Sequence, residues 1–326
     1  MAEVETVRGP VDVGSLGQVL MHEHLFTLGT EIRQNYPDYP DPWDEDHRVA
    51  DAVAKLKECA SGGIRTIVDP TVLGLGRYIP RVQRINEQVD INIVVATGIY
   101  TYHDEPIQFH FIGPGRVFDV PEPMVELFVK DIRDGIADTG VKAGLLKCAI
   151  DEHGLTPGVE RVLRAVGQAH VETRTPITVH TSAHLHTGLI AQKVLKEEGV
   201  DLSKVVIGHC GDTADLDYLR EIADAGSILG MDRFGIDVFL PFEDRVNTVA
   251  ALARDGYADR MVLAHDSSCY SDFYPEQRRM TLLPKWTLVH VSDDVLPALR
   301  ERGVTEDQIT TMLVDNPRRY FTGAQA

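Results

Sequence analysis

The feature that most constrains the fold of this chain is a regular alternation between short apolar, β-branched runs and longer stretches of helical periodicity. The short runs are bounded by Gly, Pro or Asp, and several helical stretches end at glycine, which tolerates the left-handed conformation that follows a helix. Eight runs are predicted to be strands: residues 18–25, 65–71, 91–100, 143–150, 176–182, 204–210, 226–232 and 260–266.

Eight near-continuous apolar strands, each followed by a helix, are typical of a closed parallel barrel, because both faces of its strands are buried. An open doubly wound sheet is the alternative, but no G-x-G-x-x-G sequence follows any strand. The chain has 326 residues and no linker or low-complexity tract. We therefore predict an α/β protein, a single TIM (β/α)8 barrel over residues 1–326, with a final helix that stops near Pro317.

Charge and composition narrow the range of partners. The formal net charge of −18 opposes binding to nucleic acids and to anionic membranes. The N-terminus has no signal-peptide core, and no apolar run reaches the roughly 18 residues of a membrane span. We expect a cytoplasmic protein with a small-molecule substrate. The four cysteines lack metal or redox spacing and are expected to be reduced, buried fillers: Cys59, Cys148, Cys210 and Cys269.

Polar side chains that can bind metals stand at or near the ends of five predicted strands. In a barrel of this kind, chemistry collects at the C-terminal ends of the strands. Each residue alone is more often structural, but their convergence at one mouth indicates a metal site. Residues two apart on a strand share a side, so the histidines of the H-x-H motif point inward, whereas Glu23 and His265 point away. The strand ends carry His22-Glu23-His24, Lys147, His180, His209 and His265-Asp266.

Lys147 and Asp266 suggest the kind of chemistry. Lys147 lies in the apolar run GLLKCAI, where burial favours the neutral, nucleophilic amine. It could form a Schiff base, contact a phosphate or carboxylate, or react with carbon dioxide to form a carbamate that offers one oxygen to each of two metals. The nearby histidines favour the carbamate. Asp266 could bind a metal and accept a proton from metal-bound water, or it could be an ion-paired structural residue.

Together these residues resemble the amidohydrolase superfamily and, more narrowly, the phosphotriesterase family, from LGQVLMHEHL to DNPRRYF. The resemblance implies two divalent metals, with zinc expected first and cobalt, manganese or iron as alternatives, and a hydroxide bridging them as nucleophile. It also implies a homodimer. By the same resemblance His22, His24 and Asp266 hold the more buried metal, His180 and His209 the more exposed one, and carbamylated Lys147 bridges both.

Two local matches are similar to the phosphotriesterase-like lactonases: TGIYTYH, which contains Tyr100, and MDRFGID, which contains Asp232 and Arg233. Segment 267–286 looks like the lid of those enzymes, which lines a channel for an acyl chain. Tyr100 could instead be barrel packing, Arg233 a structural ion pair, and the aromatic stripe of the segment a core face. Met21 before the H-x-H motif and Ser267-Ser268 after Asp266 depart from some relatives and leave the substrate preference open.

The sequence therefore predicts a binuclear metal-dependent hydrolase that opens lactone rings, such as N-acyl-homoserine lactones, and also hydrolyses phosphotriesters. Asp266, Tyr100 and Arg233 are its candidate catalytic residues. A true phosphotriesterase is the alternative. More remote alternatives are a class I aldolase that uses Lys147 as a Schiff base and a non-catalytic metal-binding barrel.

Overall fold

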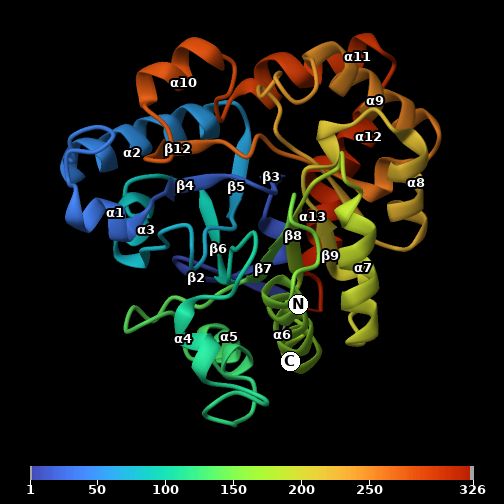
Figure 1. Cartoon of the computed structure of the whole chain (residues 1–326). Helices are drawn as coiled ribbons and strands as arrows, with labels where there is room; N and C mark the ends of the chain where they lie inside the picture. The colour runs from blue at the N-terminus through green and yellow to red at the C-terminus, as the bar shows by residue number, and fades with distance from the viewer. Residues whose placement is uncertain (1, 324–326) are drawn as a thin grey trace.

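The computed structural model describes residues 2–323 and arranges eight strands in one parallel sheet (Figure 1). The strand order is β11-β10-β9-β8-β7-β6-β5-β3, so each strand pairs with its neighbours along the chain. These strands are β3 (Gln18–Leu20), β5 (Ile64–Asp69), β6 (Asn92–Gly98), β7 (Leu145–Ile150), β8 (Ile177–Thr181), β9 (Val205–Ile207), β10 (Ile228–Met231) and β11 (Met261–Leu263).

Backbone hydrogen bonds bring the last strand back to the first. Met21 N donates to Leu263 O at 3.3 Å, and Asp266 N donates to His22 O at 2.9 Å. The sheet therefore curves into a barrel, which confirms the predicted TIM barrel and excludes the open sheet.

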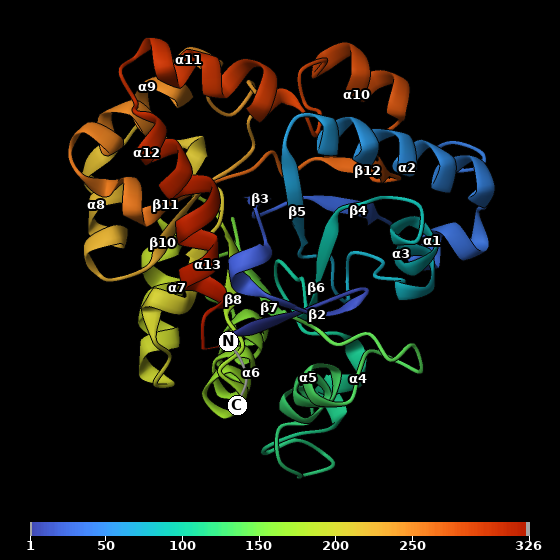
Figure 2. The ribbon, with the colours of Figure 1, turned by 180° about the vertical axis from the view of Figure 1, so that it is seen from behind.

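Helices surround the barrel, as Figure 1 and, from behind, Figure 2 show. Several begin at a capping side chain: Thr156, for example, accepts a hydrogen bond from Val159 N, and Pro157 occupies the first turn. The helices are α1 (Thr30–Asn35), α2 (Glu45–Ser61), α3 (Ile79–Asn86), α4 (Ile107–Phe111), α5 (Pro123–Arg133), α6 (Pro157–Thr173), α7 (Thr187–Glu197), α8 (Leu216–Asp224), α9 (Phe242–Arg254), α10 (Glu276–Leu282), α11 (Leu296–Glu301), α12 (Glu306–Thr310) and α13 (Asn316–Phe321).

The apolar core has two parts. A large cluster lies between the strands and the helices, and it contains all four cysteines. A smaller cluster takes a residue from most barrel strands, including Val19, Val68 and Val206, and is joined by Tyr320 and Phe321 of α13. All four cysteines are buried and free of disulfides, as predicted. Within residues 2–323, none of the helices is both long enough and apolar enough to span a bilayer.

The predicted first strand, 18–25, is interrupted in the structure. Strand β3 ends at Leu20, and β4 (His24–Thr27) begins a separate parallel pair with β12 (Ser268–Ser271). The reason is a change of partner at the H-x-H motif: Glu23 N still donates to Val68 O in the barrel, whereas His24 N donates to Ser267 O.

The predicted end of the final helix near Pro317 is wrong. The chain stays helical to Phe321, with a π-helical turn over Thr311–Asp315 before α13. Pro317 lies in the first turn of α13, where a missing N–H costs little. The N-terminal hairpin of β1 (Glu3–Thr6) and β2 (Gly9–Asp12) packs beside the barrel.

Candidate metal centre

The structure brings all six predicted metal ligands to one end of the barrel, although they lie far apart in sequence. His22 lies in the break between β3 and β4, His24 is the first residue of β4, Lys147 lies on β7 and His180 on β8. His209 and Asp266 follow β9 and β11. The four histidines and Lys147 are almost fully buried, and the side chain of Asp266 is 15% exposed.

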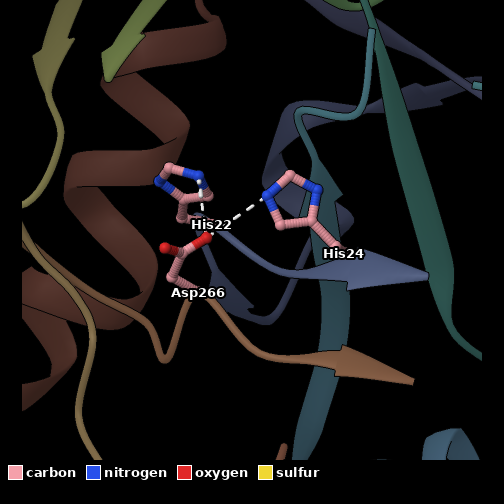
Figure 3. A group of neighbouring side chains, drawn as sticks. All are labelled: His22, His24 and Asp266. Atoms are coloured by element: carbon pink, nitrogen blue, oxygen red, sulfur yellow. Dashed lines mark ion pairs between the residues drawn. The ribbon is translucent and has the colours of Figure 1, made fainter. Parts of the chain in front are cut away.

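One group of donor atoms gathers around Asp266 (Figure 3). Its Oδ1 lies 3.4 Å from His22 Nε2 and 3.2 Å from His24 Nε2. The donor atoms of these three residues all lie within 4.8 Å of one another. Two imidazoles and a carboxylate that converge in this way form a donor set suited to a divalent transition metal.

A second pair of nitrogens faces the same space. His180 Nδ1 lies 2.7 Å from His209 Nε2, and Lys147 Nζ lies 3.4 Å from His22 Nε2. Two ring nitrogens that point at each other can share one proton or bind one cation. The buried amine of Lys147 therefore lies among side chains that can bind a metal. A carbamate formed on this amine would add its two oxygens to their set of donor atoms.

The electrostatics of the site favour neutral donors at His22 and Lys147, whereas the carboxylates of Asp266 and Asp69 raise the pKa of His24 to about 9 against the effect of burial. Burial lowers the pKa of His22 to about 3, and the charge of Lys147 acts in the same direction. Burial also lowers the pKa of Lys147 to about 8, against the opposing charges of Asp266 and Asp232. A neutral imidazole is a metal ligand, and a neutral amine can react with carbon dioxide, so these residues fit a metal centre with a carbamate.

Buried acceptors orient the histidine rings. Asp232 Oδ1 lies 2.8 Å from His209 Nδ1, and its Oδ2 lies 3.1 Å from His22 Nδ1. Thr71 Oγ1 lies 2.7 Å from His24 Nδ1, and Asp151 contacts His180 Nε2. In each ring the outer nitrogen is occupied, so the other nitrogen faces the site.

Asp232 and Asp151 are functional candidates that the sequence analysis did not assign. Asp232 lies in MDRFGID and immediately follows β10, so its place at a strand end is a signal that the sequence does carry. Asp151 immediately follows β7 and carried the same signal. Charge from His209 and hydrogen bonds from both histidines hold the pKa of Asp232 well below its usual range, against the effect of burial.

Three residues after consecutive strands adopt left-handed backbone conformations. The φ angles are 63° for His209, 61° for Arg233 and 52° for Asp266. Residues with a Cβ rarely adopt such angles, and they do so most often at functional sites where the surroundings enforce them. Each of these residues lies in the segment that follows its strand, and from that segment its side chain reaches the site.

Tyr100 and Arg233, the other predicted catalytic residues, border the metal centre. Tyr100 Oη donates to Tyr102 Oη at 2.6 Å and lies 3.4 Å from His180 Nδ1. Arg233 donates to Asp266 Oδ2 at 3.0 Å and to Asp212 Oδ2 at 2.9 Å. Burial raises the pKa of Tyr100, so its hydroxyl stays a hydrogen-bond donor near neutral pH. Both residues line the same cavity, and their catalytic roles stay predictions.

A cavity of about 460 Å³ opens above these residues. Segment 267–286, the predicted lid, contains β12 and α10 and supplies much of its wall. Tyr270, expected to share a stripe with Phe273 and Tyr274, is instead buried under the guanidinium of Arg48. The apolar and aromatic lining consists of Leu75, Tyr100, Tyr102, Ile236, Val238, Phe239, Phe273, Tyr274, Leu282, Leu283 and Trp286.

Comparisons with known proteins agree with this geometry. The model of the phosphotriesterase family matches residues 2–321. A phosphotriesterase homology protein of Mycobacterium tuberculosis (strain ATCC 25618 / H37Rv) is 59% identical over 322 residues, which cover 98% of each chain. An aryldialkylphosphatase of Saccharolobus solfataricus is 41% identical over 315 residues, or 96% of this chain and 97% of that protein. The solved structure of the phosphotriesterase from Mycobacterium tuberculosis has a TM-score of 0.97 and 58% identity, and the match covers 99% of both chains.

Proposed function

Because the chain belongs to the phosphotriesterase family of metal-dependent hydrolases, we propose that it is a lactonase that also hydrolyses phosphotriesters. The observation that carries this proposal is the polarity of the cavity: candidate metal ligands line one part of it, and mainly apolar side chains, with Arg278 and Arg279 among them, line the rest. A lactone with an acyl chain, such as an N-acyl-homoserine lactone, matches both parts, since its ring reaches the candidate ligands and its chain covers the apolar walls.

The metal centre of this proposal is binuclear. His22, His24 and Asp266 would hold one cation, His180 and His209 the other, and a carbamate on Lys147 would contribute an oxygen to each. Zinc is the first candidate, with cobalt, manganese or iron as alternatives. Two divalent cations there would supply an activated water near neutral pH and polarise the carbonyl or phosphoryl oxygen of the substrate.

The protein's own residues would orient the substrate and move the proton. Asp266 lies against both histidines of the H-x-H motif and Arg233, so it is placed to accept a proton from the attacking water and pass it to the leaving alkoxide. The hydroxyl of Tyr100, which donates to Tyr102 Oη in this structure, would redirect its proton to the lactone carbonyl oxygen as negative charge develops there. The apolar walls would exclude water from the acyl chain of the substrate.

A true phosphotriesterase is the second candidate, because a 41% identical relative is named an aryldialkylphosphatase. The donor set alone does not distinguish attack at carbon from attack at phosphorus. A Schiff-base aldolase would have no use for the histidines around Lys147. A non-catalytic metal site would be closed, whereas this cavity reaches His22, His24 and His180.

A homodimer is also part of the proposal. Apolar side chains stand exposed on α4, in the loop after it and on α5, where they would be covered in an association of two copies. This apolar α4–α5 surface comprises Ile107, Phe111, Val117, Phe118, Val120 and Leu127.

The experiment that tests the function compares kcat/KM for a long-acyl homoserine lactone and for a neutral aryl phosphotriester. The protein would be reconstituted with metal in bicarbonate-containing buffer. We expect the lactone to be preferred by several orders of magnitude. The opposite preference would make this a true phosphotriesterase and would remove the proposed roles of Tyr100 and the cavity wall in lactone binding.

A further inference from the structure

We propose that Glu23, the residue between the two histidines of the H-x-H motif, is a positioning residue for Asp266. This inference rests on the metal centre proposed above and adds a residue that does not touch it. The side chain of Glu23 is fully buried and points away from the cavity, toward the segment that follows β11.

The carboxylate of Glu23 holds the backbone on both sides of Asp266. His265 N donates to Oε1 at 2.7 Å, and Ser267 N donates to Oε2 at 3.0 Å. The ring of His265 adds a third contact, with Nδ1 lying 2.6 Å from Oε1. One carboxylate thus holds the backbone N–H groups of both residues that flank Asp266 in the chain.

Apart from the hydrogen bond from Asp266 N to His22 O, the backbone of Asp266 is not held by regular sheet pairing and needs this support. Strand β11 ends at Leu263, and Asp266 adopts a φ of 52°. An aspartate in this left-handed conformation is uncommon and persists where its surroundings impose it. If the flanking N–H groups were released, the backbone could relax and turn the carboxylate of Asp266 away from His22 and His24.

The same contacts reach the end of the predicted lid. His265 Nε2 accepts a hydrogen bond from Val291 N at 2.7 Å, which leaves Nδ1 as the donor to Glu23. Trp286 Nε1 donates to His265 O at 2.8 Å, and Trp286 lines the cavity. Glu23 is therefore joined through His265 to the cavity wall as well as to Asp266.

The test compares Glu23→Gln with the wild type, both loaded with cobalt. The amide NH2 of glutamine cannot accept a hydrogen bond, so one of the two flanking N–H groups loses its partner. Residues that orient metal ligands commonly contribute about 10–100-fold to metal affinity or activity. We expect cobalt release into excess chelator to be at least about tenfold faster, with a changed visible spectrum and a lower kcat at an unchanged KM.

Glu105→Gln is the matched control. Glu105 is also buried, and it accepts hydrogen bonds from Arg116 and Arg161. It belongs to a separate group of possible cation donors with Asp104 and His110, none of which is among the six candidate ligands. This variant should lose thermal stability but release cobalt at the wild-type rate.

If Glu23→Gln does not fold, Glu23→Asp replaces it, because the shorter side chain keeps the charge but cannot span both N–H groups.

The outcomes are distinguishable. Cobalt release at the wild-type rate with an unchanged spectrum, from whichever Glu23 variant folds, would overturn the role of Glu23 and leave the metal centre intact. Faster release from Glu105→Gln to the same extent would also overturn it, because the effect would then be a general loss of stability. A wild-type protein that binds no cobalt would refute the metal centre itself, and with it this role of Glu23.

Discussion

At the scale of single residues, Asp266 joins the parts of the site. It contacts both histidines of the H-x-H motif and the guanidinium of Arg233, and its own backbone conformation is imposed by neighbours. Such a residue can serve both as a ligand and as a proton acceptor, and a substitution that keeps its shape separates these functions.

We expect Asp266→Asn to keep the fold and most of the metal, because its amide oxygen can still serve as a metal donor beside His22 and His24. The amide cannot accept a proton, so kcat should fall by about 10²–10⁴-fold. Metal analysis and steady-state kinetics on the same preparation would check this. A metal-loaded variant with near wild-type kcat would remove Asp266 from the proton path.

Lys147 provides a second prediction at this scale. Its buried amine has a pKa lowered to about 8, so it should react with carbon dioxide during metal loading. Reconstitution with ¹³C-labelled bicarbonate should give a protein-bound carbamate resonance in the wild type and none in Lys147→Met. If labelled wild type shows no such resonance while fully active, the carbamate is absent and another group completes the metal centre.

At the scale of elements, we expect segment 267–286 to determine how long a substrate can be. Its α10 and Trp286 line the cavity together with Val238 and Phe239 of the loop after β10. Each methylene that this wall removes from water should contribute about 0.8 kcal/mol, or roughly fourfold in kcat/KM, through a lower KM. Rates for a series of acyl lengths would show this slope until the chain outgrows the cavity.

Leu283→Asp should flatten that slope, because it places a charge in the apolar wall. We expect a loss of about tenfold or more for long chains and little change for short ones. Leu155→Asp, at a partly exposed leucine outside this cavity, is the matched control. An unchanged slope in Leu283→Asp would show that the acyl chain lies elsewhere.

Helix α6 carries a pH-dependent contribution to stability. His170 is buried, its Nδ1–H donates to Thr175 O at 2.7 Å, and its Nε2 has no partner among the described residues. Burial lowers the pKa of His170 below 6.5. The unfolded chain therefore binds a proton more readily than the folded one, so this contribution is present above about pH 6.5 and is lost as the pH falls below it.

His170→Asn keeps a donor for Thr175 O and removes the titrating ring. The difference in free energy of unfolding between wild type and variant should therefore be larger at pH 7 than at pH 5, as measured by urea denaturation. A difference that is equal at both values, or that grows as the pH falls, would contradict the lowered pKa.

At the scale of the whole molecule, charge and apolar surface act against each other. Each copy carries a formal charge of −18, which disfavours association unless apolar burial outweighs the repulsion. The apolar α4–α5 surface is where apolar burial can outweigh the repulsion.

Phe118→Asp should shift the protein from dimer to monomer in sedimentation experiments, whereas Leu185→Asp, at an exposed leucine beside α7, should not. A monomeric wild type would refute the homodimer, and a dimeric Phe118→Asp would place the interface elsewhere.

The sequence by itself determined the class of fold and which six candidate metal ligands meet at one end of the barrel. Strand and helix periodicities are local properties, and the rule that polar strand ends meet at one mouth follows from the parallel barrel alone. His22, His24, Lys147, His180, His209 and Asp266 were all found in this way, and Glu23 and His265 were placed outside the cavity.

Only the tertiary structure decided how those residues are held. The break of the first strand at the H-x-H motif depends on Ser267, more than 240 residues away in the chain. The imidazole rings are likewise oriented by residues from distant segments: Asp232, Asp151 and Thr71. The burial of Tyr270 under Arg48 also depends on the tertiary structure. So do the hydrogen bonds by which Glu23 holds the residues on either side of Asp266. Periodicity indicates the face on which a side chain lies, but hydrogen-bond partners depend on which distant segments end at the same height once the barrel has closed.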